Sequence, residues 1–338
     1  MKAAILTKPY NIEIIDVEKP EIGETDVLLK VIETGICGSD LHTYKGIHPF
    51  RKPPVILGHE VAGDVVEVGK KVTDIDRGTR VAIEPQAACS VCSYCNQGRY
   101  NICPKRLLPG VGGWMGTFAE YFVSNSEKLY PLNEQVSYSS GVLAEPIAVG
   151  LHGAKRANIK ESSTLILGLG SIGIGAAFSA KILGAKQVVA TDIAKINLQV
   201  AKDFGVDTPI DVAEQDLVTT ARKYAKEGFD SVIVASGYEG VIDDAISLSK
   251  RGATIVVISL FANEITTNIN QLVIQEKEIL GSSTYTKSDF KTVVDWLNNG
   301  ELKPDSMITH KMPLEKASEA LNILDKRTEP AIKIVLKP

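Results

Sequence analysis

The chain has 338 residues, enough for about two domains that each have a hydrophobic core of their own. Its formal net charge is −4, with acidic and basic residues interleaved and no basic block, so the composition argues against nucleic acid or an anionic membrane as a partner. The first residues contain no apolar run of the length a signal peptide needs, and the cysteine count is odd. Both features favour a reducing, cytoplasmic setting over a disulfide framework.

The N-terminal part of the chain is predicted to be rich in β-strands. Short apolar runs are broken there by Gly, Pro and Asp, the pattern of strands joined by turns. These runs are Val27–Ile32, Val61–Val68, Arg80–Ile83 and Phe118–Val123.

Four of the five cysteines lie in one short loop with the spacing C-x2-C-x2-C-x7-C. Thiolates at this spacing are typical of a closed, tetrahedral zinc site. The flanking residues are polar, which argues against an accidental cluster of buried thiols. The loop also lacks the Lys and Arg surface that a nucleic-acid-binding zinc ribbon needs. We therefore predict a structural zinc that stabilises this insertion through Cys89, Cys92, Cys95 and Cys103.

The fifth cysteine, Cys37, and His59 are candidate ligands of a second, open metal site. Such a site needs a third protein ligand, and two carboxylates compete for that place. Glu60 adjoins His59, and neighbouring side chains of a strand point to opposite faces, so both reach one metal only if the backbone turns near Gly58. Glu145 precedes a proline, which predicts an extended backbone at Glu145. The residues alone leave the choice between the two carboxylates open.

Three further polar residues lie close to Cys37 in the sequence. Asp40 is a candidate partner for the spare N–H of a metal-bound histidine. Ser39 and His42 are candidates for carrying a proton away from the site. A single Cys or His in such a place is more often a packing residue or a surface imidazole, and the combination is what indicates catalysis.

From Ser162 onward, predicted strands and helices alternate, which is typical of a parallel sheet covered by helices on both faces. The predicted strands are Thr164–Leu167, Gln187–Thr191, Ser231–Val234 and Thr254–Ile258. The predicted helices are Ile172–Leu183, Ala194–Phe204 and Val241–Ser249. The chain is predicted to end with helices at Phe290–Asn298 and Leu314–Leu324, a strand near Met307 and a strand at Ala331–Leu336.

A glycine motif stands where the first of these strands gives way to a helix. In a dinucleotide-binding turn the first glycine permits the tight bend, the second admits the pyrophosphate, and the third allows close helix–strand packing. An acidic residue ends the next strand, at about the 20-residue distance expected of a carboxylate that binds the ribose diol. That carboxylate would repel a 2′-phosphate, so we expect NAD rather than NADP, although Lys195 lies nearby. The expected cofactor-binding residues are Gly168, Gly170, Ser171, Ile172, Gly173 and Asp192.

The same stretch has an alternative interpretation as a membrane span. Residues 162–180 carry no charge and approach the length that a bilayer requires. Four glycines interrupt the run, however, and its apolar pattern changes from strand-like to helix-like. A strand–turn–helix unit accounts for both features, and we expect no membrane association.

Taken together, these motifs resemble those of the zinc-dependent medium-chain dehydrogenases over essentially the whole chain. The segment 58–63, Gly-His-Glu-Val-Ala-Gly, the four-cysteine loop and the glycine motif occur in that family's order and spacing. Within the family, the segment 37–42, Cys-Gly-Ser-Asp-Leu-His, and the pair Glu145-Pro146 resemble the polyol and vicinal-diol branch. That branch includes sorbitol, threonine and 2,3-butanediol dehydrogenases.

The resemblance implies an α/β fold in which a doubly wound Rossmann domain is inserted into a β-rich, GroES-like catalytic domain. The catalytic domain would comprise residues 1–147 and 286–338, with the structural-zinc loop at 89–103, and the NAD-binding domain residues 148–285. One catalytic and one structural zinc per chain are implied, together with a homotetramer or homodimer.

For the catalytic site, the resemblance implies Cys37, His59 and Glu60 as zinc ligands. Glu145 lies where other branches place a cysteine ligand and would bind zinc directly or through water. Ser39 and His42 match the positions of the family's proton relay.

The substrate is expected to be a secondary alcohol with an adjacent oxygen function. Sorbitol dehydrogenases generally carry an Arg-Tyr pair where this chain has Thr284-Tyr285. The run from Gly281 to Phe290 and the segment Met307–His310 are closer to butanediol dehydrogenases. We therefore expect reversible, NAD-dependent oxidation of a small-molecule vicinal diol of the 2,3-butanediol/acetoin type. The alternatives are a sorbitol/L-iditol-type polyol dehydrogenase, an L-threonine dehydrogenase, and, from another class, a zinc-independent quinone-reductase-like or non-enzymatic relative.

Overall fold

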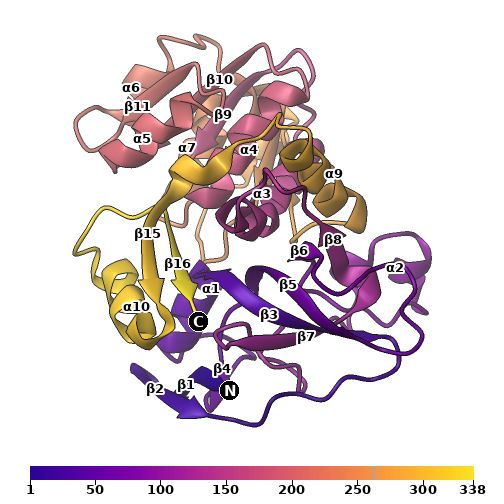
Figure 1. Ribbon diagram of the computed structural model, residues 1–338. Coiled ribbons are helices and arrows are strands. Elements are labelled where there is room, and N and C mark those ends of the chain that lie inside the picture. Colours follow the sequence, from indigo (N-terminus) through magenta and orange to yellow (C-terminus); the bar gives the residue numbers. More distant parts are fainter. Residues whose placement is uncertain (262) are drawn as a thin grey trace. The chain divides into compact units, whose positions relative to one another are not determined.

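The computed structural model describes residues 1–261 and 263–338, and the chain divides into two compact units (Figure 1). Unit 1 comprises Met1–Glu145 and Thr286–Pro338, and unit 2 comprises Pro146–Tyr285. Both ends of the chain therefore build unit 1, and the middle of the chain builds unit 2.

The main sheet of unit 1 has seven strands. Six follow the order β15-β16-β3-β5-β6-β8, and β7 pairs with β3. The long central strand β3 forms antiparallel ladders with β5, β7 and β16. The last strand of the chain, β16, therefore lies beside β3 (Figure 1). The strands are β3 (Asp26–Gly35), β5 (Glu60–Val68), β6 (Arg80–Ile83), β7 (Tyr121–Asn125), β8 (Leu129–Pro131), β15 (Ile308–Pro313) and β16 (Lys333–Lys337).

A small second sheet and several helices complete unit 1. The sheet has the order β2-β1-β4, with β1 (Lys2–Lys8), β2 (Asn11–Asp16) and β4 (Val55–Ile56). The helices are α1 (Gly38–Tyr44), α2 (Ser93–Asn96), α9 (Lys287–Asn298) and α10 (Ala317–Lys326), with 3₁₀ turns η1 (Tyr100–Ile102), η2 (Ser126–Lys128), η3 (Pro304–Met307) and η4 (Leu314–Lys316). A buried cluster that includes Tyr44, Phe118 and Leu321 joins α1, α10 and the small sheet.

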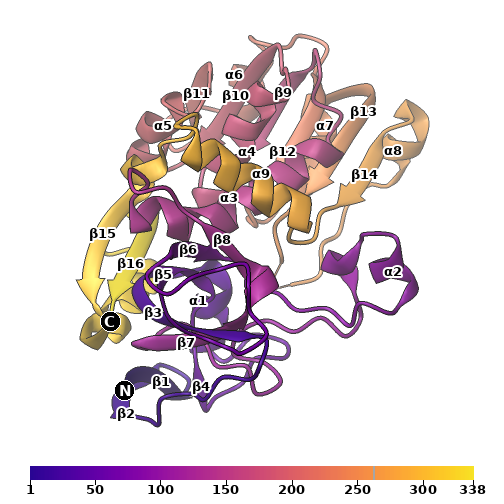
Figure 2. The ribbon, with the colours of Figure 1, turned by 45° about the vertical axis from the view of Figure 1, so that its right-hand side comes forward.

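Unit 2 contains a six-stranded parallel sheet with the order β11-β10-β9-β12-β13-β14 (Figure 2). Its strands are β9 (Ser163–Leu167), β10 (Gln187–Asp192), β11 (Thr208–Asp211), β12 (Phe229–Val234), β13 (Ser249–Val257) and β14 (Glu278–Gly281). Its helices are α4 (Ser171–Ile182), α5 (Lys195–Lys202), α6 (Leu217–Ala221), α7 (Val241–Leu248) and α8 (Asn270–Gln275). Nearly continuous apolar runs such as 165–167 and 232–234 are fully buried, as expected of strands covered on both faces. The predicted α/β class with a Rossmann-like sheet is confirmed.

One local expectation is wrong. Glu145 does not have an extended backbone but lies inside the helix α3 (Tyr138–Arg156), with Pro146 in the helix interior. A proline there costs about 3 kcal/mol because it removes a hydrogen bond and crowds the preceding turn. Burial of one large apolar side chain contributes about 1.5–3 kcal/mol. Four such side chains of α3 have no exposed surface, so packing outweighs the local preference: Val142, Leu143, Ile147 and Leu151.

Other boundaries differ by small amounts. The strand expected to begin at Phe118 begins at Tyr121, and the short helix α1 directly after Cys37 was not predicted. In the described part of the chain, no helix combines the length and apolar character that crossing a bilayer requires.

Candidate metal centres and dinucleotide turn

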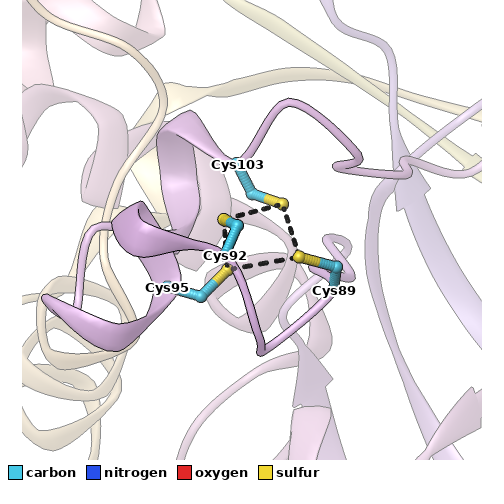
Figure 3. Close-up of side chains that lie close together, drawn as sticks. All are labelled: Cys89, Cys92, Cys95 and Cys103. Atoms are coloured by element: carbon cyan, nitrogen blue, oxygen red, sulfur yellow. Dashed lines mark hydrogen bonds between the residues drawn. The ribbon is translucent and has the colours of Figure 1, made fainter.

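The four cysteines of the loop converge on one point (Figure 3). The sulfur–sulfur distances are 3.5 Å for Cys92–Cys95 and for Cys103–Cys89, 3.9 Å for Cys92–Cys103 and 4.0 Å for Cys89–Cys95. A tetrahedral zinc ion with Zn–S bonds of about 2.3 Å places its sulfurs about 3.8 Å apart. The loop therefore has the dimensions of a closed zinc–thiolate site.

The backbone of the loop favours ionisation of one of the four thiols, whereas burial raises the pKa of Cys95 to about 12. The backbone N–H groups of Val91 and Cys92 lower the pKa of Cys89 to about 6. Cys92 stands at the N-cap of α2, and the loop belongs to an arm that extends away from the sheet of unit 1 (Figure 2). At the base of the arm, Ala87 and Leu107 exchange two backbone hydrogen bonds, of 2.8 and 3.0 Å.

A second group of potential ligands lies in unit 1. Potential ligand atoms of Cys37, His59 and Glu60 lie within 4.8 Å of one another. Cys37 is the N-cap of α1, and Glu60 is the first residue of β5. The preceding Gly58 has a φ of +91°, so the backbone does turn before the strand and allows the two neighbouring side chains to approach one point.

Glu60 is held by a lysine from the far end of the sequence. Both of its carboxylate oxygens lie 2.7 Å from Lys333 Nζ, which also donates to the carbonyl of Ile36. The carboxylate reaches β16 across Gly35 of β3, where a Cβ atom would come within 2.1 Å of Glu60 Oε2. Burial lowers the pKa of Lys333, but the negative charges of Glu60, Cys37 and Glu145 outweigh burial and raise the pKa above its usual value. Lys333 therefore carries its charge in the interior.

Asp40 organises the other side of this group. It is fully buried, and its carboxylate accepts hydrogen bonds from the backbone N–H groups of Cys37 (3.0 Å) and Gly58 (3.1 Å) and from Arg51 Nη1 (2.9 Å). His59 Nδ1 lies 3.5 Å from Asp40 Oδ1, which leaves Nε2 as the nitrogen available to a metal. Burial lowers the pKa of His59, but the charges of Asp40 and Cys37 outweigh it and raise the pKa well above its usual value, so a bound cation would displace a proton.

The remaining predicted residues lie around this group. Glu145 is buried and interacts electrostatically with Lys333. Ser39 and His42 lie on α1, three residues apart and therefore on one face of the helix. Burial and the charge of Lys45 lower the pKa of His42, so its imidazole is neutral near pH 7 and can accept a proton.

The charges of this group fit a divalent cation. If Cys37 is a thiolate, four groups are negative: Cys37 and the carboxylates of Asp40, Glu60 and Glu145. Arg51 and Lys333 supply the positive charge. Four negative groups against two positive ones leave an excess of two negative charges when His59 is neutral, as a metal ligand must be. Thiolate, imidazole and carboxylate are also the ligand types that zinc takes in catalytic sites.

Two of these charged residues were missed from the sequence. Lys333 is a lone cation in the apolar run of the last strand, and that position was the only signal of its role. Arg51 gave no signal, because it lies in a polar, proline-containing loop and its partner Asp40 is eleven residues away.

In unit 2, the glycine motif forms the turn between β9 and α4. Gly168 has a φ of +99°, and a Cβ atom there would meet Ser236 at 2.6 Å. Gly170 is the N-cap of α4 and faces open space, whereas a Cβ atom at Gly173 would lie 2.0 Å from the carbonyl oxygen of Gly168. Gly168 thus permits the bend, Gly170 leaves room for a ligand to approach, and Gly173 allows the helix to pack closely. The first turn of α4 contains no acidic residue that would repel an anion.

Asp192 ends β10 beside this turn. Its two carboxylate oxygens accept hydrogen bonds from the backbone N–H groups of Leu169 and Ala194, both at 2.8 Å, which fixes the carboxylate next to the glycine motif. Lys195, the nearby cation, forms an exposed ion pair with Glu214 at 2.5 Å.

Comparisons with known proteins point to one family. Residues 23–134 match the family model for the alcohol dehydrogenase GroES-like domain, and residues 171–299 match the model for zinc-binding dehydrogenases. A sorbitol dehydrogenase of Bacillus subtilis is 31% identical over 100% of this chain and 97% of its own length.

Two solved structures extend the comparison. The 2R,3R-butanediol dehydrogenase of Bacillus subtilis is 29% identical, with a TM-score of 0.89 over 100% of this chain and 99% of the other. A zinc-binding dehydrogenase of Sinorhizobium meliloti, bound to NADP, is 29% identical, with a TM-score of 0.90 over the same shares of the two chains.

Replacing Cys92 by Ser tests the closed site. We expect the purified variant to hold one metal ion fewer per chain and to unfold at a lower temperature, because metal binding contributes directly to folding free energy. Elemental analysis and thermal unfolding measure the two effects. If the variant keeps the metal content and melting temperature of the parent protein, the loop has no stabilising metal.

Two glycine variants test the dinucleotide turn. Gly173→Ala places a Cβ atom against the carbonyl of Gly168, so we expect unit 2 to be destabilised by several kcal/mol. Gly170→Ala has free space and a φ of −65°, so the fold should persist while dinucleotide binding weakens at least tenfold. Thermal unfolding and NADH titration by fluorescence separate the two outcomes. Unchanged NADH affinity in a folded Gly170→Ala protein would contradict this assignment.

Proposed function

The chain belongs to the zinc-dependent alcohol and polyol dehydrogenases, and we propose that it oxidises a vicinal diol with NAD, using Cys37, His59 and Glu60 as the ligands of a catalytic zinc ion. The observation that carries the proposal is the convergence of the ligand atoms of these three side chains within 4.8 Å. The buried groups around them carry an excess of negative charge that a divalent cation would neutralise. Unit 1 would hold both metal ions, and unit 2 would hold the dinucleotide.

Glu60 is our choice for the third ligand. Its carboxylate groups with Cys37 and His59, whereas Glu145 does not join that group and instead influences Lys333. A carboxylate has two oxygens, so Glu60 can offer one to the metal while Lys333 retains the other. Lys333 would then keep Glu60 oriented in the way that partners of metal ligands do.

When bound, the zinc ion supplies a Lewis acid that lowers the pKa of the substrate hydroxyl, and the dinucleotide supplies the hydride acceptor. The chain supplies the route for the proton. Ser39 would take it first, and His42, one turn along α1, would release it to solvent. The lowered pKa of His42 keeps its imidazole neutral and ready to accept this proton at neutral pH.

The choice of NAD rests on Asp192 and Lys195. The Asp192 carboxylate, fixed beside the glycine turn, would accept hydrogen bonds from a ribose diol and repel a 2′-phosphate. Lys195 is engaged by Glu214 and so offers a 2′-phosphate less attraction than a free lysine would. The Sinorhizobium meliloti relative is bound to NADP, so these residues of the chain itself carry the argument.

The choice of a vicinal diol rests on chemistry and on position 284. A zinc ion with two anionic ligands and one neutral histidine is a weaker Lewis acid than a cationic centre, so a second substrate oxygen would help to bind and orient the substrate. Thr284 stands where the polyol branch generally carries an arginine that binds a longer sugar alcohol. The Bacillus subtilis butanediol dehydrogenase supports this choice, while the sorbitol dehydrogenase supports the alternative, a polyol.

A zinc-independent, quinone-reductase-like activity is the alternative from another class. Two sets of converging ligands in unit 1 count against it. Two zinc ions per purified chain support a dehydrogenase, and none would support the alternative.

Carboxylate variants test the ligand set. We expect Glu60→Ala to lower kcat/KM at least 100-fold and to release the catalytic zinc ion, because it removes a ligand and leaves Lys333 as an unpaired buried cation. Glu145→Ala should retain two zinc ions per chain and lose less activity. Steady-state kinetics and zinc analysis distinguish the two. The opposite pattern would make Glu145 the ligand.

A panel of alcohols tests the substrate class. With NAD, we expect kcat/KM for 2,3-butanediol to exceed that for sorbitol, xylitol and threonine at least tenfold. Thr284→Arg should shift the ratio toward sorbitol, and arginine is no more hindered than β-branched threonine at the local φ of +44°. Higher activity of the parent protein on sorbitol would favour the polyol alternative.

A further inference from the structure

Arg51 is the largest fully buried side chain of the described residues, with 1% of its surface exposed. Burial of a guanidinium costs several kcal/mol unless the charge is paired. Its observed partner is Asp40, whose Oδ1 lies 2.9 Å from Arg51 Nη1. Arg51 is neither among the converging ligands nor on the proton route, so its burial requires another explanation.

That explanation lies in what Asp40 touches. The same oxygen of Asp40 that accepts from Arg51 also faces His59 Nδ1 at 3.5 Å and accepts from the backbone N–H of Gly58. This oxygen therefore lies where it can act both on the imidazole and on the turn before it. Arg51 binds this oxygen through Nη1 at 2.9 Å and so restrains its position.

Arg51 is itself covered by the segment that follows the arm of the four cysteines. A Cβ atom at Gly110 would lie 3.1 Å from Arg51 Cδ and 3.2 Å from Arg51 Nε, so the backbone of Gly110 packs directly on the guanidinium stem. Gly110 lies three residues beyond Leu107, which pairs with Ala87 at the base of the arm. The contacts thus run from Gly110 to Arg51, from Arg51 to Asp40 and from Asp40 to His59.

We propose that Arg51 is a positioning residue for the catalytic metal, and that the backbone of Gly110, just beyond the base of the arm, holds it in place. This rests on the proposed catalytic zinc site. The consequence is that the position of Gly110 and metal binding at Cys37 and His59 are coupled, so that a disturbance at Gly110 weakens this binding. A purely structural Arg51 would affect only the stability of the fold.

The first test measures the affinity of the catalytic metal without using activity. Zinc-loaded proteins are dialysed against increasing dipicolinate, and zinc per chain is counted; the ion missing from Cys37→Ser identifies the catalytic one. Removal of a residue that orients a metal ligand typically weakens metal binding about 10- to 100-fold. We expect Arg51→Met to lose the catalytic ion at correspondingly lower dipicolinate, and Arg51→Lys, which keeps the charge, to recover part of the affinity.

The second test uses two matched glycines of the segment that follows the arm. Gly110 and Gly113 both have a φ of +84°, so alanine meets the same backbone strain at each. A Cβ atom at Gly113 meets no atom within 4 Å, whereas one at Gly110 meets Arg51. We expect Gly110→Ala to weaken catalytic zinc binding and Gly113→Ala to leave it unchanged. In the cobalt-substituted protein, the absorption bands that Cys37→Ser abolishes should shift only in Gly110→Ala.

A double variant excludes an indirect route, since a Cβ atom at Gly110 would also meet Val55 at 3.2 Å. If Gly110 acts through Arg51, its substitution should have less effect on zinc affinity in the Arg51→Met background. Equal effects of Gly110→Ala and Gly113→Ala, or an Arg51→Met protein that melts earlier but binds zinc normally, would overturn the coupling. If the Cys37→Ser variant holds as much zinc as the parent protein, the proposed function is overturned instead.

Discussion

The constraint on which unit 1 depends is the balance of charge in its interior. Asp40, Glu60 and Glu145 are buried beside Cys37, and an isolated carboxylate in a protein interior costs several kcal/mol. Arg51 and Lys333 compensate two of these charges through short contacts. The remaining excess of negative charge can be lowered by protonation, as the raised pKa of His59 indicates, or by a divalent cation. The metal is thus a component of the folded interior as well as of the reaction.

This charge balance also explains why both ends of the chain build one unit. Glu60 begins β5, crosses Gly35 of β3 and meets Lys333 of β16, so three adjacent strands from distant parts of the sequence contribute to one ion pair. The middle of the chain can then form a separate parallel sheet without interrupting this arrangement.

Features with a local cause could be predicted from the sequence, and features with a distant cause could not. The four cysteines and the glycine turn depend on short spacings. The structure brings the four cysteines to one point and places the glycine motif at the start of a helix, as these spacings indicate. The extended backbone expected at Glu145 was wrong because burial of α3 outweighs the preference of a residue before proline. The role of Lys333 depends on a partner 273 residues away, and that of Arg51 depends on a loop that covers it. Neither relation leaves a pattern in the sequence near the residue.

The two metal sites differ in a way that follows from their ligands. Four thiolates around a zinc ion leave the centre with a net charge of about −2 and no open position, so it can bind neither substrate nor water and serves the fold. In the proposed catalytic site, one thiolate, one imidazole and one carboxylate would neutralise the ion, and the contact of Lys333 with Glu60 would reduce the charge that this carboxylate donates. This sharing would offset a part of the Lewis acidity that two anionic ligands remove. A lysine that shares a metal ligand can tune an open site in this way without occupying a coordination position, which leaves that position for the alcohol.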